Sequence, residues 1–185
     1  MGVGTRAVPA AAFLWGVAEA TLFFIVPDVL VSAVATLRGT RPALLAALWA
    51  GLGGVAGGLA VFLLAAAMPG ATLAAIDAVP GIGPAMLARA EDGLAAQGPA
   101  ALFVGAFSGV PYKVYAATAP QAGLPLWVFA LVSVPARLAR FVLMALGVGL
   151  LARILRPRLG VAGSVALLAV CWVAFYAFYF AVTGA

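Results

Sequence analysis

The segment EATLFFIVPDVLVSAVATL, residues Glu19–Leu37, decides the fold that the sequence predicts. It places two carboxylates, Glu19 and Asp28, in a chain that is otherwise almost entirely apolar. A charged side chain near the centre of a bilayer costs roughly 2.5–3.5 kcal/mol even on the mildest insertion scales. Acids at such positions usually have a function, so both carboxylates are candidate functional residues.

The second half of this segment is too short to cross a membrane. Pro27 stands directly before Asp28, and residues 28–37 would form about 15 Å of helix against about 30 Å of hydrocarbon. We therefore predict that the chain enters the membrane, breaks at Pro27 and returns to the side from which it came. Such a re-entrant hairpin, residues 10–37, needs protein or a wet cavity around its irregular backbone, because lipid offers no hydrogen bonds.

Composition places the chain among integral membrane proteins with a single domain, residues 1–185. Hydrophobic residues make up 66% of the sequence and charged residues 8%. The net charge of +5 is scattered between apolar segments, so we expect no nucleic-acid partner. The chain has no His and one Cys, which excludes structural zinc and catalysis by imidazole, and we expect no metal and no cofactor. Cys171 is expected to pack in an apolar helix.

Three further segments are long and apolar enough to be full transmembrane helices. They are residues 43–67, 124–151 and 161–182. In the first, glycines repeat at a spacing of four, which we interpret as a surface for close helix packing. Residues 68–99 form the one long polar stretch and are expected to be an extracytoplasmic loop with a short helix at Pro84–Ala96.

Residues 100–121 predict a second re-entrant hairpin, opposed to the first. Each of its two apolar halves is too short to span the membrane. The predicted break between the halves comes just before Lys113, at Gly109, Pro111 and Tyr112. The predicted fold is therefore an all-α integral membrane protein with three full transmembrane helices and two opposed re-entrant helical hairpins. A cleaved signal peptide is an alternative for the first apolar run, but Glu19 interrupts that run.

Charge predicts the orientation of this fold. If both hairpins are re-entrant, one side of the membrane holds six arginines and no acid, and the other holds one arginine and three acids. The first set is Arg6, Arg38, Arg41, Arg153, Arg156 and Arg158, and the second is Arg89 with Asp77, Glu91 and Asp92. Because positive charge is enriched in cytoplasmic loops, we expect the arginine-rich side and the N-terminus to be cytoplasmic.

Five charges remain at membrane depth. They are Glu19, Asp28, Lys113, Arg137 and Arg140. If the hairpin tips meet, these side chains form one polar cluster with a surplus of positive charge, which suits an anion such as phosphate. Broken helices with charges near the midplane are how many transporters build binding sites. The alternative left open is that the charges are structural ion pairs that hold the hairpins together.

Three stretches of the chain resemble the DedA, or VTT-domain (SNARE-associated), family of membrane proteins. They are the two acids with Pro27, the segment GVPYKVYAATAP from Gly109 to Pro120, and VPARLARFVLMALG from Val134 to Gly147. The chain is most similar to the short subgroup whose second hairpin reads Pro-Tyr-Lys. Lys113 takes the place of an arginine of the main subgroup. An earlier arginine of the family has no counterpart before Pro111, and Arg137 or Arg140 is the candidate replacement.

The resemblance implies a location in the cytoplasmic (inner) membrane and the movement of lipids across it. The leading hypothesis is a flippase, not an enzyme, that uses the proton motive force to move a phosphate-bearing lipid such as undecaprenyl phosphate or a phospholipid. Glu19 and Asp28 would then couple transport to protons, and Lys113, Arg137 and Arg140 would bind the lipid phosphate. The sequence leaves open whether sodium replaces the proton and whether the chain forms a homo-oligomer.

Two other classes of function are alternatives to this hypothesis. A passive phospholipid scramblase, or a protein of membrane homeostasis without ion coupling, would need a groove but no titrating carboxylate. A membrane-embedded enzyme such as a lipid phosphatase is disfavoured because there is no His and Ser108 has no visible base.

Overall fold

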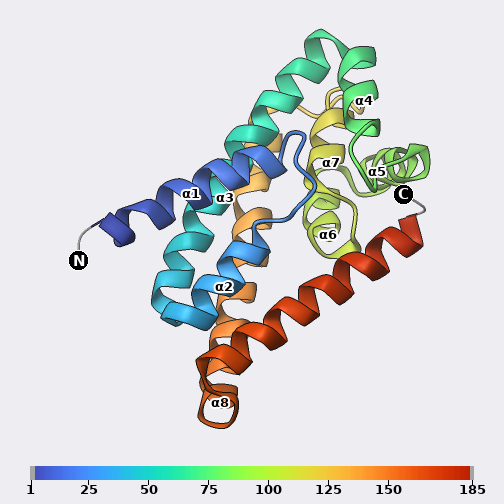
Figure 1. The fold of residues 1–185 in the computed structure, drawn as a ribbon. Coiled ribbons are helices and arrows are strands. Elements are labelled where there is room, and N and C mark those ends of the chain that lie inside the picture. The colour runs from blue at the N-terminus through green and yellow to red at the C-terminus, as the bar shows by residue number, and fades with distance from the viewer. Residues whose placement is uncertain (1–2, 184–185) are drawn as a thin grey trace.

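The computed structural model describes residues 3–183, with side chains from residue 7 onward, and every regular element in this part of the chain is helical (Figure 1). The elements are α1 (Val3–Glu19), α2 (Asp28–Arg38), α3 (Thr40–Ala67), α4 (Pro69–Asp77), α5 (Pro84–Gln97), the short 3₁₀ turn η1 (Gly98–Ala100), α6 (Ala101–Ser108), α7 (Tyr112–Thr118) and α8 (Leu126–Thr183). The side chain of Arg6, which belongs to the predicted cytoplasmic set, and the N-terminal residues 1–2 lie outside the described residues.

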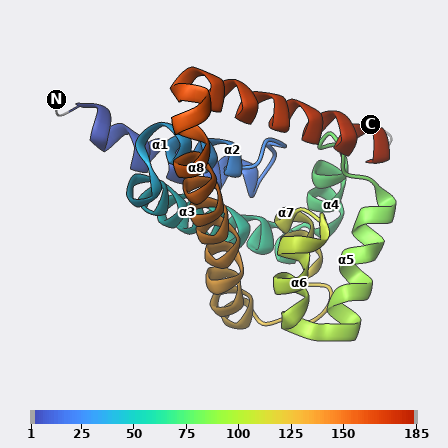
Figure 2. The same cartoon turned by 90° about the horizontal axis from the view of Figure 1, so that it is seen from below.

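Two of the described helices, α3 and α8, are long and apolar enough to cross a membrane. The backbone of α8 leaves helical geometry at Gly160, where φ is +67°. Figure 2 shows that the chain turns sharply there, so that α8 consists of two arms. We call residues 126–159 the first arm and residues 161–183 the C-terminal arm.

The basic stretch before this kink is helical, although the sequence suggested a loop. Arg153, Arg156 and Arg158 all lie within the first arm. Arginine is a good helix former, and the break comes instead at Gly160, whose positive φ most other residues adopt only with strain. The predicted spans 124–151 and 161–182 thus correspond to the two arms, with the first arm longer than expected.

The first break begins earlier than predicted. Helix α1 ends at Glu19 rather than at Pro27, and residues 20–27 form an irregular connection. The Thr21 hydroxyl donates to the carbonyl of Val17 at 3.1 Å and to that of Ala18 at 2.9 Å. Such bonds compete weakly with the helical ladder, and the ladder itself changes here, because the backbone N–H groups of Thr21 and Phe23 both bond to the Ala18 carbonyl, at 3.1 and 2.9 Å. Pro27 therefore marks the start of α2 rather than the end of α1.

The second break lies where the sequence placed it. Helix α6 ends at Ser108, Gly109 adopts a left-handed conformation with φ +84°, and α7 begins at Tyr112 after Pro111. Gly109 has the positive φ that favours glycine, and Pro111 is extended, as its fixed φ allows.

The stretch 68–99, expected to be a loop with one short helix, contains two helices. Helix α5 covers the predicted short helix, and α4 was not foreseen. Both begin with a proline in the first turn, where the missing N–H has no partner to lose.

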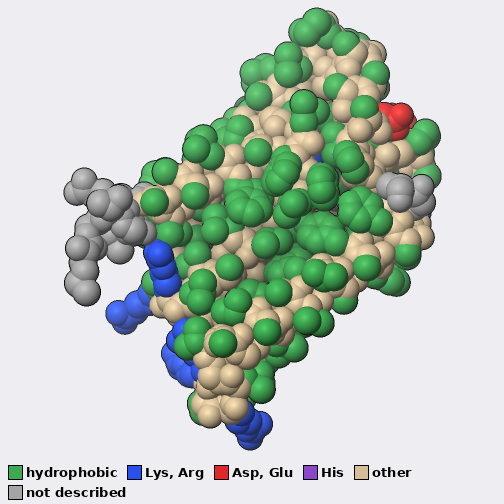
Figure 3. Space-filling view, viewed as in Figure 1, with side chains coloured by type: hydrophobic (Ala, Val, Ile, Leu, Met, Phe, Trp, Pro, Cys, Tyr) green, Lys and Arg blue, Asp and Glu red, His purple; other side chains and the backbone are tan. Residues whose placement is uncertain are grey.

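Large apolar side chains are exposed over the outside of the molecule. The most exposed include Leu14, Trp127, Leu131, Val173 and Phe178, each more than 60% accessible. Figure 3 shows hydrophobic side chains over much of one face, and the Lys and Arg visible there gather toward one end. A surface this apolar is typical of helices that face lipid.

Glycines allow α1 to lie directly against α3. A Cβ on Gly57 would come within 2.7 Å of the Val17 carbonyl, and one on Gly53 or Gly16 would collide with the backbone of the opposite helix. The glycine repeat thus serves close packing, as expected. This packing holds the end of α1, and with it Glu19, against the centre of α3.

Candidate functional site

The structure brings all five predicted charges together. Glu19 ends α1, Asp28 begins α2, Lys113 lies in the first turn of α7, and Arg137 and Arg140 lie one turn apart on the first arm of α8. Glu19, Asp28, Lys113 and Arg137 are each no more than 3% exposed. Four segments that are distant in the sequence therefore meet at one buried polar cluster.

Glu19 and Arg137 form a fully buried ion pair. The Arg137 Nη2 donates to the Glu19 carboxylate, and both side chains are at most 4% exposed. The guanidinium carbon also lies 4.8 Å from the ring centre of Tyr112 and 4.8 Å from that of Phe141. These cation–π contacts and the carboxylate fix Arg137 from several directions.

Asp28 and Arg140 form a second pair that is open on one side. The Arg140 Nη2 donates to Asp28 Oδ2 at 2.9 Å. The Asp28 side chain is fully buried, while that of Arg140 is 28% exposed. The other carboxylate oxygen, Asp28 Oδ1, is buried and has no hydrogen-bond partner among the described residues.

Lys113 joins the two broken segments. Its Nζ donates to the carbonyl oxygen of Phe23 at 2.6 Å, and this carbonyl belongs to the irregular connection between α1 and α2. Neither ion pair in the described part of the chain includes Lys113. An ammonium group has three donors, so Lys113 can offer further hydrogen bonds to a ligand.

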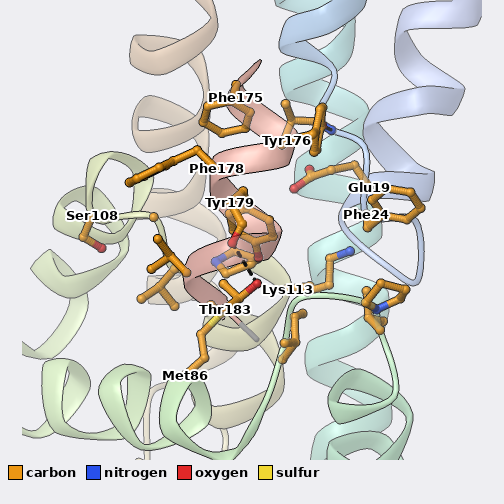
Figure 4. A pocket seen from close by; sticks show the side chains of 18 of the residues that line it. Glu19, Phe24, Met86, Ser108, Lys113, Phe175, Tyr176, Phe178, Tyr179 and Thr183 are labelled. Atoms are coloured by element: carbon orange, nitrogen blue, oxygen red, sulfur yellow. Dashed lines mark hydrogen bonds between the residues drawn. The ribbon is translucent and has the colours of Figure 1, made fainter. Parts of the chain in front are cut away.

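A first cavity of about 340 Å³ adjoins this cluster and is lined by Glu19, Lys113 and Arg140. Figure 4 shows Glu19, Phe24 and Lys113 close together, with aromatic side chains of the C-terminal arm nearby. Those aromatic lining residues are Phe175, Tyr176, Phe178 and Tyr179. The cavity thus combines cations with a largely apolar wall, as an amphipathic anion requires.

A second cavity, of about 360 Å³, lies beside the first, and Arg140 and Phe175 line both. Its other lining residues are mostly aliphatic and come from α2 and from both arms of α8; among them are Met144, Val148, Leu151, Leu155, Leu167 and Leu168. Arg140 therefore stands between two cavities, both of which have walls on the C-terminal arm.

The C-terminal arm is held to the bundle by polar contacts near the cavities. The Tyr176 hydroxyl accepts from the backbone N–H of Val26 at 2.9 Å, and Trp172 donates to the Ser32 hydroxyl at 3.0 Å. Tyr179 donates to the carbonyl of Gly81 at 2.9 Å. The arm thus touches the first broken segment, α2 and the connection between α4 and α5.

The predicted hairpin breaks lie at the edge of the cluster. Gly109 and Pro111 line the first cavity, and Pro27 is buried directly before Asp28. Tyr112 is buried, and its hydroxyl donates to Ser133 at 2.7 Å. Sequence reasoning treated Tyr112 as a break residue, but its ring also stacks under Arg137.

Sequence reasoning missed residues that make room for the cluster. A Cβ on Gly54 would lie 2.8 Å from the Arg137 guanidinium, and one on Gly58 would collide with the Tyr112 ring. Both belong to the glycine repeat of α3. The signal was present as two interleaved glycine pairs, of which one packs on α1 and the other lies against the polar cluster.

Taken as chemistry, this arrangement can hold an anion at a low-dielectric site, since three cations face two carboxylates. The Ser108 hydroxyl donates to the Gly105 carbonyl at 3.4 Å. Comparison of the chain with protein-family models, with curated proteins and with solved structures gave no match.

Proposed function

We propose that this chain is a transporter in the cytoplasmic (inner) membrane that moves a phosphate-bearing lipid in exchange for, or together with, protons. The observation that carries the proposal is the cluster of four buried charges, Glu19, Asp28, Lys113 and Arg137, with the partly exposed Arg140, beside two cavities with apolar walls. Buried charges are costly in a membrane and mark ion and substrate pathways. The same cluster is the reason to propose membership in the DedA family.

In the proposed topology, α3 and the two arms of α8 are the three full spans. The pairs α1–α2 and α6–α7 are the re-entrant hairpins, entering from opposite sides. At 1.5 Å per residue, α2 would be about 16 Å long and α6 and α7 about 12 Å or less, which is well below the roughly 30 Å of hydrocarbon. The hydrogen bond from Lys113 to the Phe23 carbonyl supports a meeting of the two tips.

The distribution of exposed charge supports the proposed orientation. Arg41, Arg153 and Arg158 are exposed and lie near the start of α3 or the kink of α8. Asp77, Glu91 and Asp92 are exposed in α4 and α5. With the arginine-rich end in the cytoplasm, this arrangement follows the positive-inside rule.

The proposed substrate combines an anionic phosphate with a hydrocarbon chain. Lys113 and Arg140 both line the first cavity and can donate hydrogen bonds to phosphate oxygens. The aromatic and aliphatic walls of both cavities offer surface for the chain. Undecaprenyl phosphate and phospholipids both fit this description.

Reconstitution into liposomes tests the proposal. Purified protein is placed in vesicles that carry undecaprenyl phosphate or a fluorescent phospholipid in one leaflet, and the movement of each lipid is followed with and without a pH gradient. We expect movement of at least one phosphate-bearing lipid, at a rate that falls when Lys113 or Arg140 is replaced by Gln. Vesicles in which neither lipid moves faster than in protein-free controls would contradict the proposal.

A passive scramblase is the second candidate, and one observation favours it. Both carboxylates of the cluster are already paired with arginine, and an acid that stays paired does not exchange a proton. The two functions differ in their response to the gradient. Glu19→Gln and Asp28→Asn variants that fold and still move lipid with an unchanged pH response would leave the scramblase as the function.

A further inference from the structure

We propose that the two ion pairs have different roles: Glu19–Arg137 is a fixed structural pair, and Asp28–Arg140 opens when a dianionic phosphate binds. In this scheme Asp28 takes up a proton when the ligand is a dianionic phosphate monoester and keeps its charge when the ligand is a monoanionic phosphodiester. The inference rests on the proposed function, because it concerns how that site binds lipid phosphate.

The two ion pairs differ in how deeply their arginines are buried. Arg137 is held by Glu19 and by two aromatic rings and is almost fully enclosed. Arg140 is 28% exposed, and its only other hydrogen bond among the described residues is a long one of 3.5 Å to the Ala106 carbonyl. The partly exposed Arg140 side chain can therefore turn toward the cavities at little cost in packing. Movement of Arg137 would instead break its ion pair with Glu19 and its contacts with two aromatic rings.

The position of Arg140 is a further line of evidence. Its side chain lines both cavities, so a phosphate in either one lies within reach of the same guanidinium. Arginine pairs with phosphate in two-point geometry as readily as with carboxylate. A dianionic phosphate that enters the cavities thus competes with Asp28 for Arg140.

One oxygen of the Asp28 carboxylate is available to take a proton. Oδ1 is buried and unpartnered among the described residues, although Oδ2 is bonded to Arg140. A buried carboxylate that loses its one cationic partner is strongly disfavoured as an anion. The carboxyl group then gains a proton, and Oδ1 can take it without giving up a hydrogen bond.

The charge of the cluster decides when this proton is needed. Lys113, Arg137 and Arg140 carry three positive charges, and Glu19 and Asp28 carry two negative charges, which leaves one positive charge. A phosphodiester with a single negative charge neutralises the cluster while both acids stay ionised. A monoester with two negative charges neutralises it only if one acid is protonated, and Asp28 is the acid whose partner can leave.

Glu19 is the other carboxylate of the cluster that could take this proton, but its partner Arg137 stays in place. From the elements packed on α2, the charged or titratable groups that face Asp28 are Arg140 and Tyr176 of α8, and Tyr176 interacts electrostatically with both acids. Neither of these two groups can take up the proton, because the guanidinium is already charged and the phenol is neutral. Helix α3 carries one charged residue, Arg41, in its first turn and next to the far end of α2. Arg89 lines the first cavity but is exposed on α5.

Binding of a monoester exchanges hydrogen-bond partners and adds one proton to the protein. A dianionic monoester forms hydrogen bonds to Arg140 and Lys113, the Arg140–Asp28 hydrogen bond breaks, and one proton from water attaches to the Asp28 carboxylate. No covalent bond to phosphorus changes. A phosphodiester accepts hydrogen bonds from Lys113 and from the N–H groups of Arg140 that Asp28 does not use, so the Arg140–Asp28 hydrogen bond stays. The surplus positive charge of the cluster balances this ligand and no proton enters.

Calorimetric titration of the purified full chain in detergent tests the inference. The probes are dodecyl phosphate and dodecyl methyl phosphate at pH 7, where a monoester, with a second pKa of about 6, is mostly dianionic. Titrations in two buffers of different ionisation enthalpy give the number of protons bound with each ligand. We expect uptake of about one proton per dodecyl phosphate and about none per dodecyl methyl phosphate.

Variants assign the proton to a residue. Asp28→Asn should bind dodecyl phosphate at least as tightly as the unchanged chain but without proton uptake, because Asn has the charge of a protonated Asp. Glu91→Gln, at an exposed site on α5, is the matched control and should retain the uptake. The comparison of the two esters on the unchanged chain decides the question even if Asp28→Asn does not fold.

Several results would overturn the inference. Equal proton uptake with both esters, binding of the monoester without uptake, or uptake that persists in Asp28→Asn would each do so while leaving a lipid-phosphate transporter in place. If neither ester binds, the inference and the proposed site both fail.

Discussion

The Nζ of Lys113 donates a hydrogen bond of 2.6 Å to the carbonyl oxygen of Phe23, which lies 90 positions earlier in the chain. The donor lies in the first turn of α7, directly after the second break, and the acceptor lies within the first break. A backbone carbonyl in an irregular segment at membrane depth needs a donor from the protein, because lipid supplies none. This bond therefore satisfies the backbone of one broken segment with the side chain of the other.

Replacement of Lys113 should weaken the binding of a phosphate ligand. A hydrogen bond to a charged group contributes about 1.5–3 kcal/mol, so Lys113→Gln should reduce affinity for dodecyl phosphate roughly 10-fold to 100-fold. Lys113→Arg should retain part of the affinity, since the charge stays while the donor geometry changes. Titration calorimetry of the purified variants measures the effect.

The control for Lys113 is Arg158→Gln, a charge removed at an exposed site far from the cluster. This variant should bind dodecyl phosphate like the unchanged chain. Equal losses in Lys113→Gln and Arg158→Gln would show that net charge, and not the site, governs binding.

The Glu19–Arg137 pair should be important for stability. Removal of one partner from a buried ion pair destabilises a protein by about 3–5 kcal/mol, because the other charge is left uncompensated. Glu19→Gln should therefore lower the melting temperature in detergent clearly. Asp28→Asn should lower it less, since Arg140 is partly exposed and can reorient toward water.

Thermal unfolding of both variants, followed by circular dichroism or a thiol-independent fluorescence probe, makes this comparison. A larger loss of stability in Asp28→Asn than in Glu19→Gln would contradict the assignment of the fixed pair. The double change Glu19→Gln with Arg137→Gln should recover part of the stability, because no buried charge is then unpaired.

The glycines beside the cluster should tolerate no larger side chain. Gly58→Ala would place a Cβ inside the Tyr112 ring, and Tyr112 in turn carries Arg137 on its face. We expect lower thermal stability and slower lipid movement. Gly147→Ala is the matched control, because Gly147 is also helical and a Cβ added there would meet no neighbouring atom within 4 Å; alanine there should be neutral or slightly stabilising.

Much of the fold could be predicted because membrane insertion restricts what an apolar chain can do. The position of the second break at Gly109 followed from two short apolar segments, whereas Pro27 gave only the start of α2 and not the end of α1. The spacing of three between Arg137 and Arg140 placed both on neighbouring parts of one helix. The acids and cations were grouped correctly because unpaired charges at that depth are too costly to lie apart.

Other features depend on packing that sequence patterns do not reveal. At the early end of α1, the backbone N–H groups of Thr21 and Phe23 both turn to the Ala18 carbonyl, and no period of apolar residues in the sequence predicts this change. The sequence also gave no way to tell which arginine pairs with which acid. That choice follows from the position of α1 against α3, and hence from the glycines between them.

Sidedness is the property on which the proposed topology depends, and single cysteines can measure it. In a Cys171→Ala background, Arg6→Cys, Arg41→Cys and Arg158→Cys should react with an impermeant maleimide from the cytoplasm. Asp92→Cys should react from outside. Residues 41, 92 and 158 are exposed, so a failure to react from one side reports the membrane and not burial in the protein.

A topology in which one of the two segments crosses the membrane once gives a different labelling pattern. If residues 100–121 crossed the membrane, the cysteines at 41 and 158 would react from opposite sides, because α8 would start from the other face. If residues 10–37 crossed once, the cysteines at 6 and 41 would react from opposite sides while those at 41 and 158 stayed together. Two re-entrant hairpins with three spans put 6, 41 and 158 on one side and 92 on the other. A segment that crossed twice would give the same pattern, but α2, α6 and α7 are too short for that. The six arginines of the basic end predict that the shared side is the cytoplasm.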